Sequence, residues 1–205
     1  MMNELIKSTE SENKFVKLNV VIIGLPGSGK SSLMNSLSIK PNYLSLGDIT
    51  RFALATEAPL AKAIREKFQT SEPWPADFVM DIISPYLLTA RANNMGFVLD
   101  GIPRKVDEAK ILTDWAFRNE MDLDLVLHLQ IDPEKAIQRI VGRDNSGRLE
   151  TMAHYANRIS KYLAEEEEML GIMQNNSRKI LTINTDNNPP GFAKSQLLDF
   201  IRCNF

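Results

Sequence analysis

The stretch that decides the fold is residues 19–32, which read Asn19-Val20-Val21-Ile22-Ile23-Gly24-Leu25-Pro26-Gly27-Ser28-Gly29-Lys30-Ser31-Ser32. A β-branched apolar run leads straight into a Gly-x-x-x-x-Gly-Lys-Ser spacing, which is typical of a phosphate-binding loop between a buried strand and a helix. Glycines let successive backbone N–H groups converge on phosphate oxygens, and Lys30 adds a positive charge. The helix that begins near Ser31 points its positive end at the same anion. The stretch therefore predicts a strand, a loop that holds a nucleoside triphosphate, and a helix start.

Composition limits what can surround this loop. The chain has 205 residues, of which 43% are hydrophobic and 24% charged, as expected for one globular domain with insertions. Its net charge of −2 provides no basic field, so we expect no nucleic-acid partner. Cys203 is the only cysteine, which excludes an internal disulfide and a cysteine-built zinc site and favours a reducing, cytoplasmic location. The longest apolar stretch, residues 18–25, is too short for a membrane anchor or signal peptide, and residues 1–14 are expected to form a flexible arm.

Strand and helix patterns alternate along the chain. Strands are expected at residues 18–23, 43–46, 96–100, 123–131 and 180–183, and helices at 31–37, 53–69, 77–93, 107–119, 134–141, 151–174 and 193–200. This alternation predicts an α/β fold of the P-loop three-layer type, with a parallel five-stranded sheet, helices on both faces and a ligand at the carboxyl ends of the strands. The four glutamates at 165–168 are expected to form a solvated helix face, and neither His128 nor His154 is given a catalytic role.

Four segments, taken together in their order and spacing, resemble the adenylate kinase family. They are the phosphate loop, Leu44-Ser45-Leu46-Gly47-Asp48-Ile49-Thr50-Arg51, Val98-Leu99-Asp100-Gly101-Ile102-Pro103-Arg104, and the arginines Arg139, Arg143, Arg148 and Arg158. The resemblance covers nearly the whole chain from residue 18 and implies a single nucleoside monophosphate kinase domain, residues 1–205. It also implies a monophosphate-binding region at about 47–78 and a short lid at about 143–151, because only residues 144–147 separate two of the lid arginines.

The resemblance implies a role for each matching residue. ATP would be bound by Gly27, Ser28, Gly29, Lys30, Ser31, Ser32 and, against its adenine, Arg139. The monophosphate would be bound by Leu46, Asp48, Arg51, Trp74, Gly101, Arg104 and Glu108, with the two arginines on its phosphate. The catalytic cations would be Lys30, Arg104, Arg143, Arg148 and Arg158, and Mg²⁺ would be held by Ser31 and, partly through water, by Asp100. The implied partners are ATP and a nucleoside monophosphate, bound by a monomer that has no membrane partner.

The segments that would read the acceptor base depart from the family pattern. Leu46 stands in place of the usual threonine, Trp74 lies in an unusual proline-rich segment, and Glu108 stands in place of the usual glutamine. AMP is the expected acceptor. GMP or IMP is favoured if Glu108 lines the base pocket, because a carboxylate only accepts hydrogen bonds and guanine offers two donors side by side. The alternatives are a kinase for another nucleoside monophosphate, CMP and UMP included, a P-loop kinase of a non-nucleotide small molecule, and a nucleotide-binding module without turnover.

Overall fold

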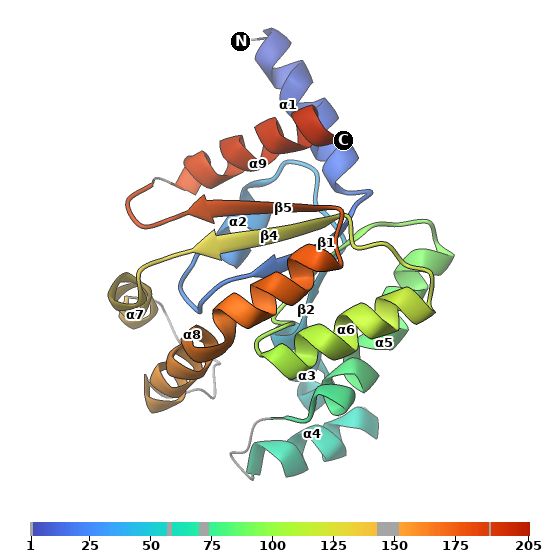
Figure 1. Cartoon of the computed structure of the whole chain (residues 1–205), viewed down its shortest axis with the longest axis vertical. Coiled ribbons are helices and arrows are strands. Elements are labelled where there is room, and N and C mark those ends of the chain that lie inside the picture. The colour runs from blue at the N-terminus through green and yellow to red at the C-terminus, as the bar shows by residue number, and fades with distance from the viewer. Residues whose placement is uncertain (1, 57–58, 70–73, 143–151, 189) are drawn as a thin grey trace.

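A parallel five-stranded sheet forms the centre of the computed structural model (Figure 1). The structure describes residues 2–56, 59–69, 74–142, 152–188 and 190–205. The strands are β1 Asn19–Ile23, β2 Tyr43–Ser45, β3 Phe97–Asp100, β4 Leu125–Gln130 and β5 Lys179–Asn184, in the spatial order β2-β3-β1-β4-β5. The α/β fold with a parallel sheet, predicted from the alternating pattern, is confirmed.

The helices that accompany these strands also follow the sequence pattern. They are α1 Met2–Phe15, α2 Lys30–Ser36, α3 Leu46–Ala55, α4 Pro59–Gln69, α5 Ala76–Ala92, α6 Val106–Arg118, α7 Pro133–Val141, α8 Met152–Asn175 and α9 Pro190–Asn204. The stretch expected as a helix at 53–69 is divided between two helices, the end of α3 and the whole of α4, which lie together beyond one end of the sheet (Figure 1). Within the described residues, none of the helices has both the length and the apolar character needed to cross a bilayer.

Helix α3 begins earlier in the chain than the sequence pattern predicts. The Ser45 hydroxyl accepts a hydrogen bond from the backbone N–H of Asp48 at 3.3 Å, which makes Ser45 the N-cap of the helix. The expected strand at 43–46 therefore loses Leu46 to α3. As a result, the monophosphate motif of the sequence forms the first turn of a helix that starts directly at the end of β2.

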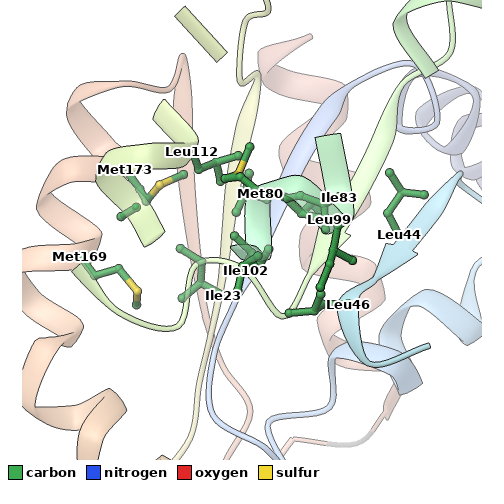
Figure 2. Packing of buried hydrophobic residues seen from close by; sticks show 14 of the residues in the cluster. Ile23, Leu44, Leu46, Met80, Ile83, Leu99, Ile102, Leu112, Met169 and Met173 are labelled. Atoms are coloured by element: carbon green, nitrogen blue, oxygen red, sulfur yellow. The ribbon is translucent and has the colours of Figure 1, made fainter. Parts of the chain in front are cut away.

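Both faces of the sheet are covered because its strands are apolar on both sides. In β1, Val21 and Ile23 belong to the core formed with α5, α6 and α8, whereas Val20 and Ile22 belong to the core formed with α2 and α9. Figure 2 shows the first of these cores, in which side chains of the sheet and of the loop after β3 lie with methionines of α8. The sheet is thus fixed from both sides, and its carboxyl edge can position loops accurately.

The expectation of a flexible arm at residues 1–14 is corrected by the structure, which has helix α1 here. Helix α1 packs against α9 (Figure 1), and Phe15 at its end is fully buried. Glu12 is 1% exposed; one carboxylate oxygen lies 2.8 Å from Lys194 Nζ of α9, and the other accepts from the backbone N–H of Ile39 at 2.7 Å. The partners of Glu12 are distant in sequence, so the local pattern could not indicate that this polar segment is packed.

Candidate functional site

The phosphate loop connects β1 to α2 at the carboxyl edge of the sheet. Its glycines Gly24, Gly27 and Gly29 have φ values of +149°, +91° and +95°, which residues with a side chain rarely adopt. Space is also restricted, because a Cβ at Gly27 would lie 2.6 Å from the carbonyl oxygen of Ala136 in α7, and one at Gly24 would lie 2.4 Å from that of Leu129 in β4. All three glycines are therefore favoured by the backbone conformation, and Gly24 and Gly27 are also required by the close approach of β4 and α7.

Lys30 and Ser28 are the side chains of this loop that an anion would engage. Lys30 Nζ donates to the carbonyl oxygens of Gly24 at 2.7 Å and Leu25 at 3.0 Å, so the ammonium lies over the loop. Ser28 is fully buried, and among the described residues its hydroxyl has no hydrogen-bond partner. A buried polar group without a partner is unusual and calls for an explanation. A phosphate in the loop would give this hydroxyl an acceptor and would lie against the Lys30 ammonium.

The motif after β2 and the motif after β3 meet beside this loop. Ser45 of β2 is in register with Asp100 of β3, so both strands end at the same level of the sheet. A Cβ at Gly101, whose φ is +87°, would lie 2.9 Å from an Nη of Arg104 and 3.5 Å from Cβ of Leu46. The structure therefore brings together Leu46, Gly101 and Arg104, which the sequence assigned to the monophosphate.

Tyr43 of β2 is a residue of this site that the sequence analysis missed. Its hydroxyl donates to Oδ2 of Asp100, and the Ser31 hydroxyl lies close to it. Burial, and then the neighbouring Asp100 carboxylate, raise the pKa of Tyr43 far above its ordinary value, so the phenol stays a neutral donor. Tyr43 connects the two residues assigned to Mg²⁺. A tyrosine in a short strand carries no sequence signal that separates this role from core packing.

The oxygens of Ser31 and Asp100 suit Mg²⁺. This ion keeps several waters and is usually bound by one or two carboxylates together with substrate phosphates. In the part of the chain that the structure describes, no group of three or more His, Cys, Asp or Glu side chains could form a protein cage for a metal. The donor set therefore fits an ion that enters with a nucleotide, with Asp100 as the carboxylate and Ser31 as the hydroxyl.

Glu108 lies beneath the arginine of the monophosphate motif. It is 6% exposed, and its Oε2 accepts from the backbone N–H of Arg104 at 2.7 Å. Burial raises the pKa of the Glu108 carboxyl, against the opposing effect of the Arg104 charge. Nearby, Lys105 Nζ donates to the carbonyl oxygen of Trp74 at 3.0 Å, and the Trp74 ring meets Phe78 edge-on with centroids 5.5 Å apart. The hydrogen bond of Glu108 fixes the loop that carries Arg104. That Glu108 also recognises the acceptor base stays a prediction.

Arg139 and Arg158 lie on the helices before and after the expected lid, and Arg139 donates to the carbonyl oxygen of Gly27 in the phosphate loop at 3.4 Å. The guanidinium of Arg139 in α7 donates to the carbonyl oxygens of Thr185 at 2.6 Å and Asp186 at 3.2 Å, so it joins α7 to the loop after β5. Arg158 lies early in α8, with its guanidinium carbon 5.9 Å from the centre of the Tyr155 ring. Arg139 is therefore held beside the phosphate loop at the carboxyl edge of the sheet, whereas the ring contact of Arg158 lies within its own helix.

The other assigned residues are not all brought into the site. Arg51 forms an ion pair with Asp48 on the surface of α3, where both side chains are about half exposed and such a pair contributes little stability. Ser32 is exposed at the start of α2. Arg143 and Arg148, with the whole expected lid at 143–151, lie outside the described residues.

Two of the glutamates at 165–168 are corrected from the expected solvated face. Glu165 Oε2 accepts from the backbone N–H of Val106 at 2.6 Å, and Glu166 Oε1 lies 3.0 Å from Nε2 of the buried His128. The hydrogen bond with His128 lowers the pKa of the Glu166 carboxyl, against the effect of burial. Glu165 and Glu166 lie on the side of α8 that packs on the sheet and on α6. The sequence could not show this, because four identical residues in a row give no sign of which of them face the core.

A cavity of about 260 Å³ lies beside the phosphate loop, at the carboxyl ends of β4 and β5. Leu25 of the loop lines it, together with the carboxylates of Asp132, Glu166 and Asp186. Negative side chains repel a polyphosphate, so the phosphates are assigned to the loop and not to this cavity. The glycine loop with Lys30, rather than this cavity, is the candidate anion site.

These features define a class of protein before any comparison. A glycine loop after the central strand of a parallel sheet, with an acidic residue at the end of the neighbouring strand, is the arrangement of a P-loop nucleotide-binding protein. A family model described as adenylate kinase matches residues 22–178. The chain belongs to the adenylate kinase family.

Individual relatives carry the same description. Over 128 residues the chain is 34% identical to an adenylate kinase of Thermosipho africanus, and the aligned region covers 62% of this chain and 59% of that protein. It is 34% identical over 147 residues to adenylate kinase 4 of Arabidopsis thaliana, with 70% and 58% covered, and 28% identical over 165 residues to an adenylate kinase of Leptospira biflexa, with 76% and 88% covered. The chain thus spans less than two thirds of the length of the first two relatives.

Proposed function

We propose that the protein is a nucleoside monophosphate kinase, which transfers the γ-phosphoryl group of ATP to AMP in the presence of Mg²⁺. The observation that carries the proposal is the meeting of two phosphate-binding motifs, residues 24–30 after β1 and residues 101–104 after β3, on adjacent strands of one sheet. Membership of the adenylate kinase family, and relatives that are named adenylate kinases, support the same activity.

The positively charged side chains would bring together two polyanions, ATP and the nucleoside monophosphate. On binding ATP, Lys30 would exchange the carbonyls of Gly24 and Leu25 for phosphate oxygens. Arg104, held on its loop by Glu108, would bind the phosphate of the monophosphate through a planar fork of donors. Positive charge from both sides would then offset the repulsion between donor and acceptor while the transferring group moves in line.

The remaining assigned residues complete the donor side. Mg²⁺ supplies charge neutralisation to the phosphates when bound, and Ser31 and Asp100, oriented by Tyr43, are the residues that would hold it. Arg158 would approach the transferring group from α8, and Arg139 would present its flat guanidinium face to the adenine.

Arg143 and Arg148 are assigned to the lid, and Arg51 to the acceptor phosphate. The structure shows Arg51 paired with Asp48 at the surface, so this arginine would have to leave its partner when the monophosphate binds. An exposed pair of this kind contributes about 0–1 kcal/mol, so the exchange costs little.

AMP is proposed as the acceptor because of how Glu108 is used. Two parallel bonds to the donors of guanine would need both carboxylate oxygens. Glu108 is 6% exposed and its Oε2 accepts from the backbone N–H of Arg104, so the carboxylate faces the loop and does not present both oxygens to a base. We therefore expect the Glu108 carboxylate to hold the loop of Arg104 and not to bind the acceptor base.

A coupled assay with ATP and Mg²⁺ tests the proposal with AMP, GMP, IMP, CMP, UMP, a sugar and shikimate as acceptors. We expect AMP to give the highest kcat/KM. Phosphorylation of the sugar or the acid alone would instead identify a small-molecule kinase, and nucleotide binding without turnover would identify a binding module. In the variant Glu108→Gln we expect the order of acceptors to stay the same; a shift of about 5- to 100-fold toward AMP would instead assign Glu108 to the base.

A further inference from the structure

Helix α6 begins next to the proposed acceptor site, and two carboxylates accept from backbone N–H groups here, one just before the helix and one at its first residue. Its N-cap residue, Lys105, makes no capping side-chain bond. Glu108 accepts from the N–H of Arg104 at 2.7 Å, and Glu165 accepts from the N–H of Val106 at 2.6 Å. The first N–H groups of a helix have no partner inside the helix, and a negative charge near them is also stabilised by the helix dipole. The second carboxylate comes from α8, 59 residues further along the chain.

The segment from Asp100 to Val106 is fixed at three points besides the bond from the backbone N–H of Arg104 to Glu108. Its start is paired in the sheet, and Ile102 in its middle is 1% exposed and lies in the core with Leu46 (Figure 2). Its end is held by the bond from Glu165. Arg104 lies between the second and third points, so its position depends on both.

Glu165 is also linked to the donor side through its own helix. Arg158 lies seven residues earlier in α8, about two helical turns, so it is on the same side of the helix as Glu165. A second contact between the two helices, from Lys110 Nζ to Glu168 at 3.3 Å, is exposed at both ends and therefore contributes little. Of these two polar contacts, the bond from Glu165 is the one that holds the beginning of α6 to α8, beside the apolar packing between the two helices.

We propose that Glu165 is a positioning residue for Arg104. By capping α6 from α8, it connects the arginine of the acceptor phosphate to the helix that carries Arg158. This proposal rests on the proposed function, which gives Arg104 its role. Loss of the bond leaves the N–H of Val106 without its partner and loosens the loop that presents Arg104, whereas the phosphate loop is untouched. Affinity for the monophosphate should therefore fall while affinity for ATP stays the same.

Calorimetry on the full chain, with AMP and ATP titrated separately, measures this difference. In Glu165→Ala we expect the Kd for AMP to rise about 3- to 10-fold, the effect of one lost hydrogen bond, and the Kd for ATP to stay within about twofold. Glu165→Gln keeps an acceptor oxygen and should restore most of the AMP affinity. Glu167→Ala is the matched control, because Glu167 is exposed on the same helix and makes no bond among the described residues; it should bind both nucleotides as the unmodified protein does.

A double-mutant cycle shows whether Glu165 acts through Arg104. If it does, Glu165→Ala has no further effect on AMP affinity once Arg104→Ala is present. Full additivity of the two changes would overturn the positioning role.

Amide hydrogen exchange of the protein without nucleotide gives an independent readout. Exchange at Val106 should be faster in Glu165→Ala than in the unmodified protein and in Glu167→Ala. Unchanged exchange with unchanged AMP affinity, in a chain whose unmodified form is active, refutes the positioning role alone. An unmodified protein that binds no nucleoside monophosphate refutes the proposed function, and the assignment of Glu165 with it.

Discussion

Replacement of Lys30 by methionine tests the phosphate loop most directly. Methionine keeps a side chain of similar length and removes the charge. In the structure Lys30 Nζ donates to the carbonyl oxygens of Gly24 and Leu25 at 2.7 and 3.0 Å. The variant therefore loses two bonds within the loop as well as the charge on the transferring phosphates, and the two effects have different sizes.

The expected loss of stability is small. A hydrogen bond contributes about 0.5–1.5 kcal/mol net, so two lost bonds lower the free energy of unfolding by about 1–3 kcal/mol. The expected loss of turnover is larger, because cations in phosphoryl transfer contribute about 10³–10⁵ in rate, and the lower figure corresponds to about 4 kcal/mol at the transition state. We therefore expect Lys30→Met to fold and to lose at least about 10³ in kcat.

Lys40→Met is the matched control for this experiment. Lys40 Nζ also donates to two backbone carbonyls, those of Asn35 at 2.7 Å and Leu37 at 2.6 Å, but it lies beyond the far end of α2. Urea unfolding should show similar losses of stability in both variants, and the coupled assay should show a loss of turnover only in Lys30→Met. A Lys30→Met protein with native-like circular dichroism and more than about a tenth of the unmodified activity would refute the reasoning. Equal losses of activity in both variants would refute it as well.

Three further changes test other parts of the structure. Arg104→Ala should weaken AMP binding strongly and leave ATP binding unchanged in calorimetry; an equal fall in ATP affinity would remove Arg104 from the acceptor site. Tyr43→Phe removes the buried donor of Asp100 and should lower the free energy of unfolding in urea by about 1.5–3 kcal/mol, whereas unchanged stability would mean that this bond contributes nothing. Burial raises the pKa of Glu12. The hydrogen bonds that its carboxylate accepts from Lys194 and from the backbone lower the pKa by more, so it lies below its ordinary value of 4.5. The pKa of Glu12 is thus lower in the folded protein than in the unfolded chain, and the ionised carboxylate stabilises the fold. This stabilisation is present above about pH 4.5 and is lost as the pH falls through the folded pKa. Urea unfolding at acid pH should therefore show a flatter decline in Glu12→Gln, and an unchanged decline would contradict the assignment.

The sequence by itself determined the fold class and predicted the anion site. A β-branched run followed by Gly-x-x-x-x-Gly-Lys-Ser is a local signal, because backbone conformation and phosphate geometry act within a few residues. The same is true of the alternation of strands and helices, whose elements were predicted to within a few residues for most of the chain. Asp100 and Arg104 could be assigned from their motif, and the structure brings Arg104 beside Leu46 and Gly101, as the assignment requires.

Tertiary structure alone decided which polar side chains serve the site and the fold. Tyr43 reaches Asp100 across 57 residues, and Glu165 reaches Val106 across 59. Four glutamates in a row look alike in the sequence, yet one caps α6, one binds His128 and the others are exposed. The reason is physical: periodicity and propensity report what each residue prefers locally, whereas the partner of a buried polar group is set by which helices pack together, and that packing exists only once the chain has folded.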